Sequence, residues 1–198
     1  MLIVITGLDG SGTSSIAQKL NELDQGSYLL RTPSPEYADR KMVDTYVRQE
    51  SSVGHMLYYL SSNVYMSDYI KKHIDLREKD VFLVRYLVDT VVSNRVAGIP
   101  IDLDYNIYGN ELLEPDLTIF VMVDEKERQK RILSRGMDAL DHVLDDESKR
   151  IKFLMEYNQL LDPAKTIVVN NSDDLDKVAI ETYEKVKKFK GVGPKKGI

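Results

Sequence analysis

The N-terminal stretch of the chain passes from a short apolar run through a glycine-rich loop directly into an amphipathic segment. Leu2–Ile5 has the length and the Ile and Val content of a buried strand, and the loop after it reads Gly7-Leu8-Asp9-Gly10-Ser11-Gly12-Thr13-Ser14-Ser15. Three glycines in six positions let successive N–H groups turn inward, and the predicted helix Thr13–Leu23 adds positive potential at its N-terminus. This order favours a phosphate-binding loop over a plain turn in which Ser and Thr only cap the helix.

The rest of the chain repeats the alternation of strand and helix. Further apolar runs of strand length are Tyr28–Leu30, Val81–Val84, Leu117–Val123 and Thr166–Val169. The other predicted helices are Glu36–Gln49, Gly54–His73, Leu87–Ala97, Glu125–Arg135, Glu147–Leu161 and Leu175–Phe189. Strands without polar alternation, each followed by a helix, predict an α/β domain with a five-stranded parallel sheet and helices on both faces.

Composition narrows the class of protein. The 198 residues fit one domain, which we expect to span residues 1–189, with 190–198 as a flexible basic tail. A net charge of −5 disfavours wrapping of duplex nucleic acid, and the absence of cysteine excludes disulfides and thiol catalysis. No apolar run approaches the roughly 18 residues of a membrane span. We therefore expect a soluble cytoplasmic protein without nucleic-acid or membrane partners.

The glycine loop follows the pattern G-x-x-x-x-G-K-[ST] with one change. Thr13 stands where the pattern has the lysine that reaches the β- and γ-phosphates of a nucleotide. The hydroxyl of Ser14 or Ser15 can still bind Mg²⁺. Lys19 lies about a turn and a half along the helix, too far to replace the missing ammonium easily. The loop therefore predicts nucleotide binding through backbone amides and leaves the source of the positive charge open.

The loop Gly7-x-Asp9-Gly10-x-Gly12 with Ser14 resembles the phosphate loop of the thymidylate kinase family. Other pieces of the family pattern are matched in order by Arg31-Thr32-Pro33, Arg85-Tyr86, Glu114–Val121, the arginines Arg128, Arg131 and Arg135, and Tyr157-Asn158. The resemblance covers roughly residues 1–185. It implies the fold of a P-loop nucleotide kinase that moves the ATP γ-phosphoryl group to a nucleoside monophosphate such as dTMP, with Mg²⁺.

The resemblance also implies roles for single residues. Catalytic roles fall on Asp9, Arg85 and Arg135, and acceptor-binding roles on Arg31, Tyr59, Arg85 and Tyr86. The donor nucleotide falls to Gly7, Gly10, Ser11, Gly12, Thr13, Ser14, Ser15 and Arg131, with Ser14 also on the metal. A flexible lid is expected at about residues 136–147, and a homodimer is expected because the family usually dimerises.

Several positions depart from the family pattern. Val84 replaces an aspartate near the metal, Val64 replaces a substrate arginine, and Ser93 replaces a tyrosine. The predicted lid contains no Lys or Arg. Since phosphoryl transfer depends on positive charge around the γ-phosphate, these losses predict slow turnover that Thr13→Lys raises, unless another cation has taken the place of the lysine.

The departures keep other functions open. A catalytically impaired nucleotide-binding protein, a deoxynucleoside kinase and a domain that binds no nucleotide are the alternatives. Single residues have alternatives as well: Asp9 as an acid at the start of the helix, Arg85 in a structural ion pair, and Tyr59 in the core or at a dimer face.

Overall fold

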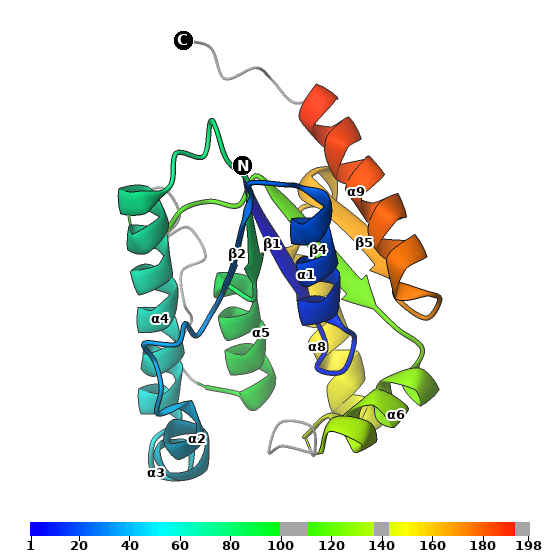
Figure 1. Cartoon of the computed structure of the whole chain (residues 1–198). Helices are drawn as coiled ribbons and strands as arrows, with labels where there is room; N and C mark the ends of the chain where they lie inside the picture. Colours follow the sequence, from blue (N-terminus) through cyan, green and yellow to red (C-terminus); the bar gives the residue numbers. More distant parts are fainter. Residues whose placement is uncertain (100–110, 137–142, 193–198) are drawn as a thin grey trace.

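All five strands of the central sheet run parallel, in the order β2-β3-β1-β4-β5. The computed structural model describes residues 1–99, 111–136 and 143–192 (Figure 1). The strands are β1 (Leu2–Gly7), β2 (Tyr28–Arg31), β3 (Val81–Val84), β4 (Leu117–Met122) and β5 (Thr166–Asn170). The predicted five-stranded parallel sheet is confirmed, and the glycine loop follows its central strand.

Helices cover both faces of the sheet, as the sequence predicts. They are α1 (Thr13–Leu23), α2 (Arg40–Met42), the π-helix η1 (Val43–Val47), α3 (Arg48–Glu50), α4 (Ser52–His73), α5 (Leu87–Ala97), α6 (Glu125–Arg135), α8 (Glu147–Leu160), the 3₁₀ turn η3 (Pro163–Lys165) and α9 (Leu175–Val192). Ile3 and Ile5 of β1 pack in one core cluster with α1 and α9, while Leu2 and Val4 pack in another with α4 and α5. This split follows the alternation of side chains along a strand.

Two helix ends differ from the prediction by three residues or more. The helix expected at 36–49 begins only at Arg40, because the chain first turns, with Tyr37 N donating to Ser34 O at 2.9 Å. At the other end of the chain, α9 continues to Val192, past the predicted start of the tail at 190.

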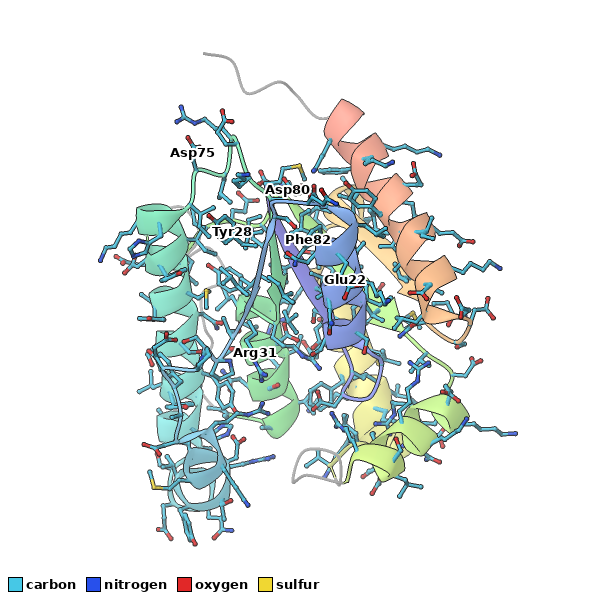
Figure 2. The ribbon with its side chains drawn as sticks, viewed as in Figure 1. Glu22, Tyr28, Arg31, Asp75, Asp80 and Phe82 are labelled. Carbon is cyan, nitrogen blue, oxygen red and sulfur yellow. The ribbon has the colours of Figure 1, made fainter. Side chains whose placement is uncertain are left out.

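The extension of α9 is held by ion pairs. Lys190 Nζ pairs with Asp80 and lies 3.7 Å from Asp24 Oδ2. Figure 2 shows Asp80 at the start of β3, at the opposite end of the sheet from Arg31. Residues 193–198 of the expected tail lie outside the described residues, as do residues 137–142 of the expected lid. Within the described ranges, no helix has the length and apolar character to cross a membrane.

Candidate active site

A cavity of about 1520 Å³ opens at the carboxyl ends of the strands. This is the end at which open parallel sheets bind ligands. The glycine loop, α6 and the start of α8 form one side, which we call the donor half. The end of β2 with α2, η1, α3 and α4 forms the other side, the acceptor half, and Arg85 at the end of β3 lies between them.

Glycine is required at two turns of the loop. Gly10 has φ 84°, and a Cβ there would lie 2.9 Å from side-chain atoms of Arg128 and Ile132. Gly12 has φ 93°, and a Cβ there would lie 2.3 Å from Asn171 Nδ2. Gly12 is the N-cap of α1 and offers no side-chain cap, so the first N–H groups of α1 have no capping side chain and can donate to an anion.

Most of the predicted donor-binding residues border the cavity. They are Gly7, Gly10, Gly12, Thr13, Ser14, Ser15 and Arg131. Ser11 does not border it: the residue is buried, and its N–H donates to Leu8 O at 3.1 Å within the loop. Ser11 therefore shapes the loop, and its position in the motif could not reveal which way its side chain turns.

Arg131 braces the loop from α6. Its Nη2 donates to Asn171 O at 2.8 Å, its Nη1 to Ser11 O at 3.4 Å, and its Nε to Glu127 Oε1 at 3.0 Å. Asn171, only 2% exposed, adds a bond from Nδ2 to Ser11 O at 2.8 Å. Sequence reasoning missed Asn171 because its partner lies 160 positions away along the chain.

Arg128 ties the loop to the start of α8. It is 1% exposed, and its guanidinium pairs with both oxygens of Glu125 at 2.7 and 2.8 Å. Arg128 also donates to Asp9 O and Leu144 O, each at 3.2 Å. A buried charge needs such partners, and here they fix the loop relative to α8.

Arg85 forms ion pairs with two carboxylates. The sequence left this structural role open beside phosphate binding. Arg85 Nη2 donates to Asp9 Oδ1 at 2.6 Å and Nη1 to Asp89 Oδ1 at 2.7 Å, while Nη1 also contacts Gly7 O. Burial alone would lower the pKa of Arg85, but the carboxylates of Asp89 and Asp9 outweigh it and raise that pKa. Its φ of 66° is strained for a residue other than glycine, as at many active sites.

Asp89 is the centre of this network, and the sequence analysis missed it. Oδ1 accepts from Thr6 Oγ1 at 2.7 Å and Tyr157 OH at 2.9 Å as well as from Arg85, and Oδ2 accepts from Tyr86 N at 3.0 Å. Burial, with the charge of Asp89, raises the pKa of Tyr157 well above its ordinary value. The phenol therefore keeps its proton and donates to Asp89.

A second network occupies the acceptor half. Within η1, Asp44 accepts from Tyr59 OH at 2.7 Å and Arg40 Nε at 3.2 Å, and His55 Nε2 lies 2.9 Å from it. Burial raises the pKa of Tyr59, so its hydroxyl stays protonated. The Tyr59 ring lies 4.9 Å from that of His55, and both border the cavity. A single π-turn often marks a functional site, and this one carries Asp44.

Three more cations border the acceptor half without partners. Arg31 ends β2, Lys41 lies in α2 and Arg48 begins α3. Among the described residues, none of these three side chains forms a hydrogen bond or ion pair. Figure 2 shows Arg31 at the lower end of the sheet, as the last residue of β2. The acceptor half thus holds three positive charges that no other group in the described ranges pairs with.

The remaining predicted residues, Arg135 and Tyr86, differ in their exposure. Arg135 borders the cavity and is exposed. Tyr86 touches the cavity edge, but its side chain is 1% exposed and packs with Leu87 and Val91 in the core, where burial raises its pKa to about 12. Asn94 was not predicted: its Nδ2 is buried at the cavity and has no hydrogen-bond partner in the described part of the chain.

Comparison with known proteins identifies the family and the fold. The thymidylate kinase family model matches residues 5–181. The thymidylate kinase of Mycoplasmoides gallisepticum is 28% identical over 193 residues, which cover 90% of both chains. The structure of thymidylate kinase from Candida albicans matches 96% of this chain and 92% of that chain, with a TM-score of 0.71 at 21% identity. That of deoxyadenosine kinase from M. mycoides matches 95% and 100%, with a TM-score of 0.70 at 19% identity, so both show the fold alone.

Proposed function

Since the chain belongs to the thymidylate kinase family, a family of nucleoside monophosphate kinases, we propose that it transfers the γ-phosphoryl group of ATP to dTMP. An oxygen of the acceptor phosphate forms the new bond to the γ-phosphorus. The bond from that phosphorus to the β,γ-bridging oxygen breaks, and its electron pair leaves with ADP. Catalysis of this step consists mainly of positioning the two phosphates and stabilising negative charge between them.

The observation that carries the proposal is the charge of the acceptor half. Arg31, Lys41 and Arg48 border the cavity and have no partners in the described ranges. A nucleoside presents a neutral hydroxyl and gives these three cations nothing to neutralise, whereas a monophosphate brings about two negative charges. This charge supports a monophosphate as the acceptor over a deoxynucleoside.

Fewer residues of the cavity bear on the base of the acceptor than on its phosphate. Asn94 Nδ2 is a buried donor with no partner among the described residues, and Tyr59 offers a ring face at the same cavity. A buried donor favours a base with a carbonyl oxygen, because a ligand acceptor removes the cost of leaving the N–H unpaired. Thymine has two carbonyl oxygens, which supports dTMP.

On the donor side, we assign the ATP phosphates to the backbone from Gly10 to Ser14. Mg²⁺ prefers oxygen ligands, and the Ser14 hydroxyl and Asp9 carboxylate both border the cavity, so these residues fit the ion. Bound together with ATP, the ion neutralises charge on the phosphates. We assign the acceptor phosphate to Arg85, which is held between Asp9 and Asp89, and the transferred group to Arg135, which borders the same cavity.

A coupled ADP-release assay with Mg²⁺ and ATP tests the proposal. The acceptors are dTMP, the other deoxynucleoside monophosphates, and the matching deoxynucleosides. We expect phosphorylation of dTMP above the other monophosphates and no turnover of deoxynucleosides. Turnover of deoxynucleosides alone would identify a deoxynucleoside kinase. A rise in melting temperature with ATP but no turnover of any acceptor would identify an impaired nucleotide-binding protein.

We further propose that the enzyme is a single kinase domain that works as a homodimer in the cytoplasm. Met42, Tyr46 and Leu57 lie on α2, η1 and α4, and each exposes 51% or more of its surface. Apolar side chains grouped in this way are typical of a partner surface. Light scattering should give twice the monomer mass for the wild type and the monomer mass for Leu57→Glu. A monomeric wild type would contradict the proposal.

A further inference from the structure

The donor half lacks a cation in the place where the loop pattern has one. Thr13 begins α1, and its side chain is neutral, short and largely buried. An ammonium at this point would act on the β- and γ-phosphates as a point charge. If the chain is a kinase, as proposed above, another cation at the cavity has to supply that charge.

Most cations near the loop are already committed to protein partners. Arg131 is bound to Glu127 and to two carbonyl oxygens, and Arg85 is held between two carboxylates. Arg128 is buried against Glu125, and Arg135 also has an interaction of its own. Each would have to give up bonds in order to move to the nucleotide.

Lys149 differs from these arginines. It lies in the first turn of α8 and borders the same cavity as Thr13, Ser14 and Arg131. In the part of the chain that the structure describes, its Nζ forms no hydrogen bond or ion pair. It is also the first cation after the expected lid, which contains no Lys or Arg. Lys149 is therefore a cation at the donor half with its charge still available.

The backbone of Lys149 is held close to the loop. Asp146 caps α8 and accepts from Ser148 N at 2.8 Å and Lys149 N at 3.4 Å. Just before this cap, Leu144 O accepts from Arg150 Nη1 at 2.8 Å and from Arg128 Nη2 at 3.2 Å. Arg128 also donates to Asp9 O in the loop. This chain of bonds fixes the start of α8 against the loop while the Lys149 side chain stays free.

We propose that Lys149 Nζ takes the place of the missing loop lysine and contacts the β- and γ-phosphates of ATP. The inference rests on the proposed kinase function for its effect on rate, but not for its effect on ATP binding. The loop supplies the backbone amides, and the first turn of α8 supplies the charge. A neutral residue at position 13 is then sufficient, because α8 supplies the positive charge at the same cavity.

The test compares Lys149→Met with Lys152→Met. Lys152 lies one turn further along α8, does not border the cavity, and donates only to Val96 O at 3.4 Å among the bonds of the described residues. Both variants lose one positive charge. We expect Lys149→Met to lower kcat/KM for ATP by about 100-fold or more and Lys152→Met to leave it unchanged. Melting temperature without ligand checks that both variants fold.

A rescue variant makes the test sharper. Thr13→Lys should restore at least tenfold of the loss in the Lys149→Met background, but it should not raise the rate of the wild type, where the charge is already present. A Lys149→Met enzyme that matches Lys152→Met, or a wild type that gains tenfold from Thr13→Lys, overturns the inference.

Binding separates this inference from the proposed function. Calorimetry should show weaker ATP binding in Lys149→Met than in Lys152→Met, with dTMP binding equal in the two variants. Absence of turnover with every acceptor would refute the proposed kinase function, and the difference in ATP affinity would still decide the role of Lys149. Equal ATP affinity in both variants contradicts that role even if the wild type is an active kinase.

Discussion

The arginines of the donor half are bound to protein groups, whereas two arginines of the acceptor half have no partner among the described residues. The third, Arg40, pairs with Asp44. In the donor half, Arg128 and Arg131 are tied to carboxylates and carbonyl oxygens and serve as braces for the glycine loop. In the acceptor half, Arg31 and Arg48 border the cavity without partners in the described residues. Residue type alone therefore does not indicate which arginine meets a ligand. The hydrogen bonds and ion pairs of each arginine in the folded chain separate those that brace the loop from those whose charge is unpaired.

Burial explains the difference. Arg128 is almost completely removed from water, so its charge is tolerable only with Glu125 and two carbonyl oxygens around it. Arg31 is exposed at the end of β2, and water can solvate its guanidinium until a ligand arrives. The glycine loop of the donor half is thus held in place before a nucleotide binds, whereas the charges of Arg31 and Arg48 in the acceptor half are not paired with any described protein group.

Removal of a brace should have the largest effect. Arg128→Met removes the bidentate partner of Glu125 and the donor to Asp9 O, while Arg150 still pairs with Glu125 and donates to Leu144 O. We expect the free energy of unfolding to fall by about 3 kcal/mol. Lys130→Met is the control on the same helix, because Lys130 is 80% exposed and, among the described residues, forms only a long ion pair with Glu127 at 3.7 Å. It should change stability by no more than about 0.5 kcal/mol. Urea unfolding measures both, and equal losses would mean that Arg128 is no brace.

Asp89→Asn should affect the rate more than the fold. The change removes the charge that holds Arg85, and a misplaced Arg85 should lower kcat/KM by about 100-fold. Tyr157→Phe is the matched variant, because it removes one donor to Asp89 and leaves the carboxylate charge in place. Its loss of rate should be smaller. If Asp89→Asn retains the wild-type rate, Asp9 alone is enough to position Arg85.

Arg31→Gln tests whether the unpaired guanidinium of Arg31 binds the acceptor. Since Arg31 has no partner in the described part of the chain, its loss should not change stability, and KM for dTMP should rise about tenfold, or about 1.4 kcal/mol. The KM for ATP should stay the same. Arg77→Gln is the control, because Arg77 pairs with Asp75, which Figure 2 shows at the opposite end of the molecule. A loss of ATP binding in Arg31→Gln would mean that Arg31 contacts the donor nucleotide and not the acceptor.

The sequence predicted best those features whose signal lies within a few residues. The bounds of α1 and β3 agree with the predicted Thr13–Leu23 and Val81–Val84, because apolar spacing and glycines determine them locally. The network of Asp89 could not be predicted, since its partners Thr6 and Tyr157 lie 83 and 68 positions away. The turn to a π-helix at Asp44 has no local signature in the sequence either.

The smallest predicted effect is the contribution of Asp44 to the pH dependence of stability. A matched carboxylate in the donor half allows the two halves to be compared in the same experiment. Burial alone would raise the pKa of Asp44, but hydrogen bonds from His55 and Tyr59 and the charge of Arg40 lower it below its ordinary value of 3.8. The folded chain then holds a proton at Asp44 less readily than the unfolded chain. The resulting stabilisation is present above the unfolded pKa and is lost as the pH falls through the folded one.

Urea unfolding of the wild type and Asp44→Asn should therefore differ by a constant amount above about pH 5, and the difference should shrink below 3.8. Glu125→Gln is the matched variant in the donor half. There burial would raise the pKa of Glu125, but Arg128 outweighs it and lowers the pKa below 4.5, so that difference should shrink below 4.5. His55→Phe, made in both the wild type and Asp44→Asn, should reduce the stability difference between them at neutral pH, because phenylalanine has no donor for the carboxylate. The difference measured for Glu125→Gln should not change. A stability difference for Asp44→Asn that stays constant down to pH 2 would mean that its network carries no charge, and the acceptor half would then be held by neutral hydrogen bonds alone.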